Sequence, residues 1–327
     1  SGLTVFDEFT GGDQPGDLHI IAARPGEGKS VLALEMAKGG AMAGDGQAIL
    51  SLEMDDDMQI ARLISDMSNV YNHKIQRATV DAIDWERLIR TADAIKKLPI
   101  FLEFCPGLTI LQLEPRIRWL VRTKGVKRVF IDYLQLMDSD NATKSEIQNE
   151  NLRIGKITKR LKQLAGKLGI AIVLLSQMSR DIEKRPGEKI PILSDLRDSG
   201  SLEQDANNVT FLYSPSRYDK TIPNYLLKFY PKVDSHDMQR LTFLVRSKSR
   251  NGAIGMVPVW NNRQYCRMST ITERHIYHEL GMLDLVPPHL AVKFGWEVGV
   301  QQELFAAMDK NNQSQNIGGS NGDDFPF

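Results

Sequence analysis

The amino-acid sequence predicts an α/β fold with a mostly parallel sheet and helices on both of its faces. Two observations support this fold class. Short continuous apolar runs, typical of strands buried on both sides, alternate along the chain with longer segments in which apolar residues recur at helical spacing. In addition, the first apolar run enters a Gly-rich turn that opens directly into a helical run, as expected of a strand followed by a helix.

The predicted elements follow one another as far as about Trp260. The helix after the first turn includes Val31–Ala37. The second strand contains the run Gln47–Leu52, and Glu53 is its last residue. Asp55–Asp57 are interpreted as the first turn of the next helix, where the helix dipole favours acidic side chains. Further helices are expected around Met58–Met67, Asp84–Leu98, Thr109–Thr123 and Asn151–Leu168, and strands at Pro99–Glu103, Val126–Asp132 and Ile170–Ser176. The remainder to about Trp260 is strand-rich, and beyond it a helix is possible only around His275 and His278.

The first turn has the residues of a phosphate-binding loop. Its backbone N–H groups and the N-terminus of the following helix would point at one anion, with a lysine and a hydroxyl beside it. Lys29 would reach the β- and γ-phosphates, and Ser30 would hold Mg²⁺. The general pattern has glycine where this chain has Ala23. The candidate nucleotide-binding residues are Arg24, Pro25, Gly26, Glu27, Gly28, Lys29 and Ser30.

Three further polar residues stand where predicted strands end. Asp132 ends an apolar strand, from which a carboxylate can bind Mg²⁺ or its water shell next to Ser30. Glu53 is a candidate general base that would polarise the attacking water. Gln177 follows another buried strand, where its amide would sense the γ-phosphate or simply form a hydrogen bond at the start of a loop. Together these residues predict a site for nucleotide and Mg²⁺.

Composition limits the other classes of function. The 327 residues include 41 basic and 41 acidic side chains, so nucleic acid would have to be bound through local contacts. The two cysteines, Cys105 and Cys266, form no metal or disulfide spacing and are expected to be reduced, as in a cytoplasmic protein. No apolar run has the length of a membrane span, so no membrane partner is predicted.

Six motifs in order resemble the motor domain of the DnaB-type replicative helicase family, bacterial or phage. The resemblance covers about residues 1–260, and that family's phosphate loop accepts alanine at the position of Ala23. The family's helical N-terminal domain and linker helix are expected to be missing from this chain. The motifs lie at Gly11–Leu18, Ala22–Ser30, Ser51–Met54, Ile131–Met137, Leu175–Arg180 and Leu193–Ala206.

The resemblance implies a RecA-like P-loop NTPase core that assembles as a homo-hexameric ring, with ATP at the subunit interfaces and single-stranded DNA in the central channel. By matching position it implies that Glu53 is the catalytic base, Asp132 the Mg²⁺-associated acid and Gln177 the γ-phosphate sensor. Lys248 and Arg250 match the basic pair that the family extends into the neighbouring subunit's site. A guanidinium supplied in this way would stabilise charge on the transferring phosphoryl group.

The resemblance also indicates where DNA would bind. Ser194–Gly200 matches the channel-facing loop of the family, so Arg197, Asp198 and Gly200 are candidate DNA-binding residues, with contact to the backbone phosphates through Arg197 and nearby N–H groups. A mixed-charge loop lies just upstream. Its basic residues are either further DNA contacts or a solvated surface.

The chain is expected to divide into a motor domain over 1–265, a C-terminal extension of unclear structure over 266–310 and a disordered acidic tail over 311–327. The polar, Gly-rich composition of the tail cannot support a core. Its tip, Asp323–Phe327, resembles the Phe-terminated tails by which single-stranded-DNA-binding proteins recruit partners, although a tail without a partner is the other interpretation. Further candidate partners are a primase and a helicase loader.

The sequence therefore predicts an ATP-driven helicase that translocates 5′-to-3′ on single-stranded DNA in the cytoplasm of a bacterium or a phage-infected cell. A RecA-like recombinase or a clock-type ATPase would share the phosphate loop and strand acids, but not Leu193–Arg197. A third alternative is a nucleotide-binding adaptor that only recruits replication proteins. The intact set of Glu53, Asp132 and the basic pair disfavours it, because a pure adaptor would not need these residues.

Overall fold

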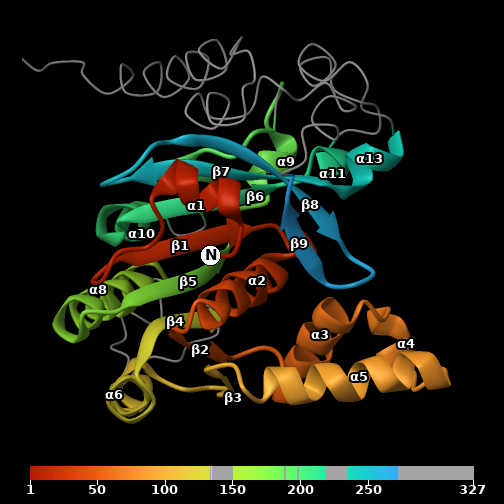
Figure 1. The fold of residues 1–327 in the computed structure, drawn as a ribbon. Coiled ribbons are helices and arrows are strands. Elements are labelled where there is room, and N and C mark those ends of the chain that lie inside the picture. Colours follow the sequence, from red (N-terminus) through yellow and green to blue (C-terminus); the bar gives the residue numbers. More distant parts are fainter. Residues whose placement is uncertain (133, 135–149, 188, 197–198, 219–234, 272–327) are drawn as a thin grey trace, which may run out of the picture.

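The computed structural model describes residues 1–132, 134, 150–187, 189–196, 199–218 and 235–271. Within them, nine strands form a single sheet in the order β3-β2-β4-β5-β1-β6-β7-β8-β9 (Figure 1). The first six of these positions are joined by parallel pairing, and β7, β8 and β9 are added antiparallel. The predicted α/β class and the mostly parallel sheet are therefore confirmed.

The strands are short, and most of them are buried on both faces. Every residue of β1, β2, β5 and β6 is buried, apart from the last residue of β5, as the continuous apolar runs predict. The strands are β1 (Leu18–Ala23), β2 (Gly46–Ser51), β3 (Ile100–Phe104), β4 (Val126–Asp132), β5 (Ala171–Gln177), β6 (Asn208–Tyr213), β7 (Leu241–Ser249), β8 (Gly255–Asn262) and β9 (Arg267–Thr270).

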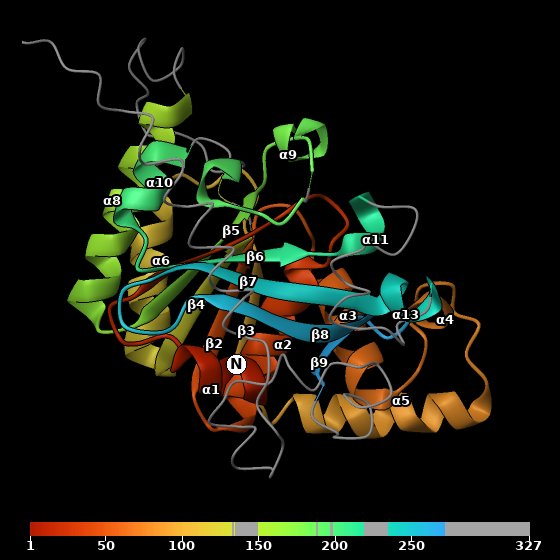
Figure 2. The same ribbon diagram turned by 90° about the horizontal axis from the view of Figure 1, so that it is seen from above.

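Helices cover both faces of the sheet. The helix α2 packs against β1 to β4 on one face, whereas α6 and α8 pack against each other and against β4, β5 and β1 on the other (Figure 2). The described helices are α1 (Thr4–Thr10), α2 (Lys29–Met42), α3 (Asp56–Ser68), α4 (Asn72–Gln76), α5 (Ala82–Ile95), α6 (Ile110–Lys124), α8 (Glu150–Leu168), α9 (Asp181–Lys184), α10 (Ser199–Asp205), α11 (Pro215–Tyr218) and α13 (Ser235–Arg240), with a 3₁₀ turn, η2, at Leu193–Asp195.

Most predicted boundaries lie within three residues of the observed ones, and side-chain caps explain several of them. Asp55 is the N-cap of α3 and accepts the N–H of Met58, so the acidic run begins one position before the helix. Thr109 caps α6 in the same way. The second strand, β2, ends at Ser51, two residues before the predicted end at Glu53. The Ser51 hydroxyl accepts the N–H of Met54, and this hydrogen bond starts a turn. The short helices α1 and α4 were not predicted.

A charged cluster is buried at the edge of the sheet where the parallel strands begin. Asp13 lies 2.8 Å from His19 Nδ1 and 3.5 Å from Arg128 Nε, and Arg246 is 1% exposed in the same region. Burial raises the pKa of Asp13, but the charges of His19, Arg128 and Arg246 outweigh burial and hold that pKa well below its usual range. This cluster ties the loop before β1 to strands β1, β4 and β7.

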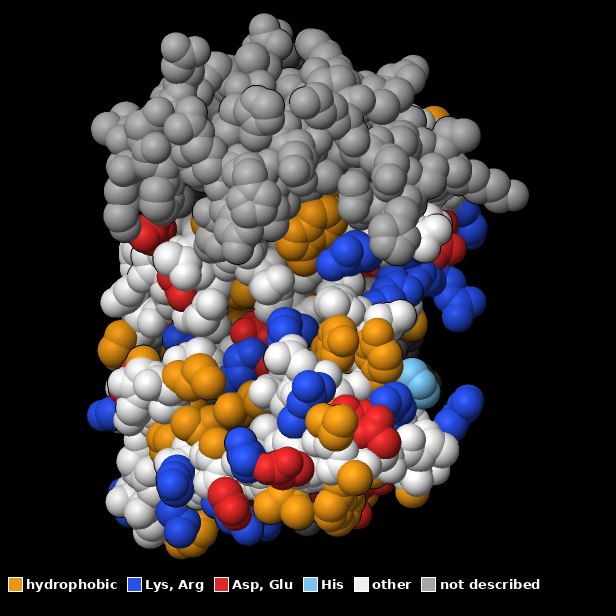
Figure 3. Space-filling model, turned by 45° about the vertical axis from the view of Figure 1, so that its right-hand side comes forward, with side chains coloured by type: hydrophobic (Ala, Val, Ile, Leu, Met, Phe, Trp, Pro, Cys, Tyr) orange, Lys and Arg blue, Asp and Glu red, His pale blue; other side chains and the backbone are white. Residues whose placement is uncertain are grey.

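Charges of both signs are mixed on the visible surface. Figure 3 shows Lys and Arg side chains interspersed with Asp and Glu, with hydrophobic side chains between them, as the equal numbers of basic and acidic residues predict. No helix in the described ranges is both long and apolar enough to span a membrane. The sheet continues through β9, past the domain boundary predicted at residue 265, and the predicted tail lies outside the described residues.

Candidate functional site

The candidate site begins at the carboxyl end of β1. The strand ends at Ala23, and α2 begins at Lys29, so its first N–H groups face the loop between them. Gly26 and Gly28 have φ angles of +82° and +94°, which favour glycine. At Gly28 an added Cβ would also lie 2.7 Å from Met268 Cε. Ala23 still pairs with Gln177 as strand, so no glycine is required there.

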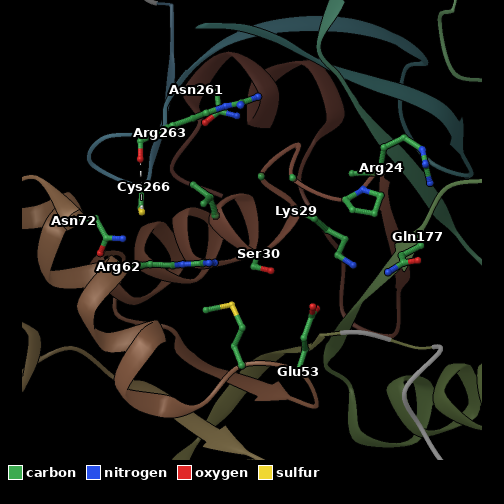
Figure 4. A pocket seen from close by; sticks show the side chains of 16 residues that line it. Arg24, Lys29, Ser30, Glu53, Arg62, Asn72, Gln177, Asn261, Arg263 and Cys266 are labelled. Carbon is green, nitrogen blue, oxygen red and sulfur yellow. Dashed lines mark hydrogen bonds between the residues drawn. The ribbon is translucent and has the colours of Figure 1, made fainter. Parts of the chain in front are cut away.

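A cavity of about 330 Å³ opens over this loop. In Figure 4, Lys29 and Glu53 point into it from opposite sides, and Gln177 lies at one end beside Arg24. Six of the seven predicted nucleotide-binding residues line it, namely Arg24, Pro25, Gly26, Gly28, Lys29 and Ser30. Glu27 is the exception: its side chain is 1% exposed and lies behind the loop.

The strand acid Asp132 meets the loop. The Ser30 hydroxyl donates a 2.6 Å hydrogen bond to Asp132 Oδ2, and Lys29 Nζ lies 3.7 Å from Asp132 Oδ1. Asp132 Oδ1 is buried and has no hydrogen-bond donor among the described residues. Burial lowers the pKa of Lys29, opposed by the charges of Asp132 and Glu53. The sequence prediction that Asp132 and Ser30 lie together is thus confirmed as geometry.

The donor atoms at this point suit Mg²⁺. A hydroxyl and a carboxylate provide hard oxygen ligands, and Asp132 Oδ1, which accepts no hydrogen bond from the described residues, could also bind a cation. Among the described residues, no group of three His, Cys, Asp or Glu side chains is arranged to hold a metal. An ion bound here would therefore take its other ligands from water and from the phosphates of a nucleotide.

Glu53 and Gln177 face the cavity from two neighbouring parts of the sheet edge. Glu53 lies in the bend after β2, is exposed and lines the cavity. Gln177 is the last residue of β5, next to Ala23 in the strand register. Neither is fixed against the other side chains of the site by a hydrogen bond between described residues, which leaves both able to respond to a bound phosphate.

The far end of the cavity is lined by residues that the motifs did not indicate. Arg62 comes from α3, Asn72 begins α4, and Asn261, Arg263 and Cys266 come from β8 and the turn that follows it (Figure 4). Asn72 Oδ1 is buried there without a hydrogen-bond partner in the described part of the chain. No local sequence pattern distinguishes these residues, because they are spread over about 200 positions of the sequence, from Arg62 to Cys266. Strand pairing and helix packing bring them together only in the folded chain.

Lys248 and Arg250 lie at the opposite edge of the sheet. Because β7 runs antiparallel to β6, Ser249 pairs with Asn208 at the beginning of β6. Arg250 Nη2 donates to the carbonyl oxygen of Gln204 at 3.2 Å, and Lys248 Nζ to that of Glu203. The pair is therefore far from the chain's own phosphate loop, as a group acting on a neighbouring subunit would be.

The candidate DNA loop is described only in part. Arg197 and Asp198 lie outside the described residues, whereas Gly200 is in the first turn of α10. On the N-terminal side, Leu196 pairs with Met178, and the Ser179 N–H donates to Asp195 O at 2.9 Å. The loop therefore starts beside the carboxyl end of β5 and Gln177.

The sheet order, the phosphate-binding loop after β1 and the strand acid beside it define a RecA-like P-loop NTPase. More specifically, the chain belongs to the family described as DnaB-like helicase C terminal domain, which it matches over residues 1–270. This membership separates it from the recombinase and clock-type alternatives.

Several relatives are similar over most of this chain. It is 36% identical over 270 residues to the replicative DNA helicase DnaB of Leifsonia xyli, covering 82% of this chain and 55% of that protein. It is 33% identical over 283 residues to the DnaB of Haemophilus influenzae, covering 85% and 56%. The chain thus spans about half the length of the curated relatives it matches.

Two solved structures share the fold. A DnaB-like replicative helicase, described with its interactions with primase, superimposes with a TM-score of 0.73 and 31% identity, covering 83% of this chain and 61% of that one. The ATPase domain of G40P superimposes with a TM-score of 0.73 and 30% identity, covering 83% of this chain and 90% of that one.

Proposed function

We propose that this chain is the ATP-hydrolysing motor of a replicative DNA helicase. The observation that carries the proposal is that Lys29 and Ser30, which line one cavity at the carboxyl edge of the sheet, both meet the buried carboxylate of Asp132 beside it. Family membership extends it to unwinding of duplex DNA by 5′-to-3′ movement on a single strand. The motor would act in the cytoplasm of a bacterium or a phage-infected cell.

Phosphate binding follows from the loop. The first N–H groups of α2 and the Lys29 ammonium would hold the β- and γ-phosphates of ATP. Ser30 and Asp132 would hold Mg²⁺, which when bound neutralises charge on the phosphates. Part of the role of Asp132 in the nucleotide-free chain is to orient the Ser30 hydroxyl through their hydrogen bond.

Hydrolysis needs a base and a group that responds to the γ-phosphate. Glu53 is exposed to the cavity and has the carboxylate that a general base requires, so we assign it the proton of the attacking water. Gln177 at the end of β5 would accept or donate a hydrogen bond at the γ-phosphate. Because Gln177 is one residue from Met178, which pairs with Leu196, its movement would reach the candidate DNA loop.

A complete site would need a second subunit. Lys248 and Arg250 stand at the opposite edge of the sheet from Lys29, which supports a role at the nucleotide of a neighbouring copy. This arrangement supports a closed or open ring, which we propose to be a homo-hexamer. Arg250 would stabilise charge on the transferring phosphoryl group in trans.

DNA would pass the loop between η2 and α10. Asp195 anchors its N-terminal side by accepting the Ile192 N–H at 2.8 Å and Arg185 Nη1 at 3.0 Å. The loop would present Arg197, Asp198 and Gly200 to the backbone of single-stranded DNA. A primase or a loader, and a protein that recognises Asp323–Phe327, are the proposed protein partners.

Strand displacement on a forked DNA substrate tests the proposal. The full chain should release the displaced strand only when ATP and Mg²⁺ are both present, and the Lys29→Ala variant should release none. The Lys97→Ala variant, which removes an exposed lysine remote from the cavity, should behave like the parent. ATP hydrolysis without strand displacement would limit the proposal to the ATPase.

A further inference from the structure

Glu27 is a buried carboxyl behind the phosphate-binding loop. Its Oε2 accepts the backbone N–H of Arg24 at 3.0 Å, and its own N–H donates to Arg24 O at 3.2 Å, so residue 27 closes the loop on itself. Its carbonyl oxygen accepts Asn261 Nδ2 from β8 at 3.3 Å. With 1% of its surface exposed, the carboxyl has lost nearly all of its hydration.

The second oxygen of this carboxyl lacks a full partner. Glu27 Oε1 is buried without a hydrogen bond to the described residues, and the nearest ionic group is Arg217 Nε of α11 at 4.0 Å. The Tyr218 hydroxyl, from the same helix, faces the carboxyl and is also buried without a well-formed hydrogen bond. The Tyr218 hydroxyl has its own proton to donate and so favours the ionised carboxyl, but among the described residues Oε1 accepts no well-formed hydrogen bond.

Both nearby arginines are engaged elsewhere. Arg24 Nε donates to Glu183 Oε1 of α9 at 2.9 Å, and its Nη1 donates to Met178 O at 3.1 Å. Arg217 Nη1 donates to Pro25 O at 2.7 Å, and its Nη2 lies 3.7 Å from Glu183 Oε1. The charged and titratable groups around Glu27 are therefore Arg24 in the loop, Arg217 and Tyr218 on α11, and Glu183 on α9; Asn261 on β8 is neutral.

An ionised carboxylate in these surroundings is disfavoured. Burial without a hydrogen-bonded ionic partner stabilises the neutral acid relative to the anion. In agreement, burial raises the pKa of Glu27 to about 7, against the opposing effects of the Arg24 N–H, Arg217 and Tyr218. The loop that would receive the phosphates thus contains an acid that is partly protonated near neutral pH.

We propose that Glu27 is a positioning residue that couples nucleotide binding in this loop to the uptake of a proton. Phosphate in front of the loop repels a carboxylate behind it, so the bound state favours the neutral acid. The proton comes from solvent and bonds to Oε1, the carboxyl oxygen that accepts no well-formed hydrogen bond from the described residues. The inference rests on the proposed function only in requiring that the loop binds nucleotide.

Calorimetric titration of the full chain with MgADP, in buffers of different ionisation enthalpy, measures this uptake directly. If bound phosphate raises the pKa of Glu27 by about one unit, binding at pH 7.5 takes up about half a proton. The affinity should fall about sevenfold between pH 6 and pH 8.5 for the same reason.

Glu27→Gln keeps an acceptor for the Arg24 N–H but cannot ionise, so its uptake should be smaller by about half a proton and its affinity should change less with pH. Glu183→Gln is the matched control, because it removes a 43% exposed carboxylate facing the same arginines; it should retain the uptake. Arg217→Gln removes a cation that favours the ionised form, so the uptake should shift to higher pH.

Equal uptake in the parent and Glu27→Gln, or tight MgADP binding by the parent without uptake, would overturn the inference while leaving the proposed function intact. Failure of the parent to bind MgADP at any pH would instead contradict the proposed function. If Glu27→Gln does not fold, the direction of the shift in Arg217→Gln decides the question: no shift would overturn the inference.

Discussion

The Ser30 hydroxyl donates a 2.6 Å hydrogen bond to Asp132 Oδ2, although the two residues are separated by 102 positions in the chain. The parallel sheet makes this contact possible, since β4 ends on Asp132 and α2 starts beside the carboxyl end of β1, with only β5 between the two strands. The side chains proposed to hold Mg²⁺ therefore lie together before any nucleotide is bound.

Replacing Lys29 by alanine should weaken ATP binding. Lys29 is half-buried in the cavity wall next to Asp132, and loss of its charge-assisted contact with phosphate should cost about 1.5–3 kcal/mol, or roughly 10- to 100-fold in affinity. Fluorescence titration with a labelled nucleotide measures the change. Lys97→Ala is the control, and unchanged affinity of Lys29→Ala would contradict the assignment.

Glu53→Gln should retain nucleotide affinity while ATP hydrolysis falls by roughly 10²- to 10⁴-fold, the usual contribution of a general base. The side chain faces the cavity from the bend after β2. Single-turnover hydrolysis and equilibrium binding should be measured on the same preparation. Glu86→Gln, on an exposed position of α5, should match the parent. Parental turnover by Glu53→Gln would mean that another group is the base.

Arg250→Ala should lose ATPase activity through the neighbouring subunit. Its guanidinium donates to Gln204 O, at the edge of the sheet away from its own loop. Mixing Arg250→Ala with Glu53→Gln should create interfaces that contain one intact base and one intact arginine, and the mixture should be more active than either variant alone. Parental activity of Arg250→Ala at every protein concentration would exclude a role in trans.

Arg197→Ala should weaken binding to single-stranded DNA about equally for all sequences. A phosphate contact carries no base information, and its loss should lower the slope of log affinity against log salt by roughly one unit. Fluorescence anisotropy with oligonucleotides of different base composition tests this. Lys127→Ala, an exposed position near the start of β4, removes the same charge at the opposite edge of the sheet and should have no such effect.

Glu27 should make the free energy of unfolding fall as pH rises. The pKa of Glu27 is about 7 in the folded chain and 4.5 in the unfolded chain. The stabilisation that Glu27 gives to the folded state is therefore complete below pH 4.5 and is lost as the pH rises from 4.5 through 7. The loss should reach up to about 3 kcal/mol. In urea unfolding without nucleotide, the stability of Glu27→Gln relative to the parent should therefore increase between pH 5 and pH 8. If the free energies of unfolding of the two proteins changed in parallel with pH, the raised pKa of Glu27 would be contradicted.

Much of the fold could be predicted from local patterns. The run Val126–Asp132 has the observed bounds of β4, and the predicted phosphate-binding residues Arg24–Ser30 span the loop after β1 and the first two residues of α2. These elements can be recognised because the pattern that identifies a strand or a helix lies within a short stretch of consecutive residues. Helices α1 and α4, with seven and five residues, are too short for such a pattern to stand out.

The sequence by itself determined the α/β class, the phosphate-binding loop and the strand-end acid, because these features are written in consecutive residues. Only the tertiary structure decided that Glu27 faces Arg217 instead of the cavity and that Arg250 lies at the opposite edge of the sheet from Lys29. The physical reason is that strand order and direction are set by packing between distant segments. A side chain's neighbours across the sheet follow from that packing and leave no local pattern in the chain.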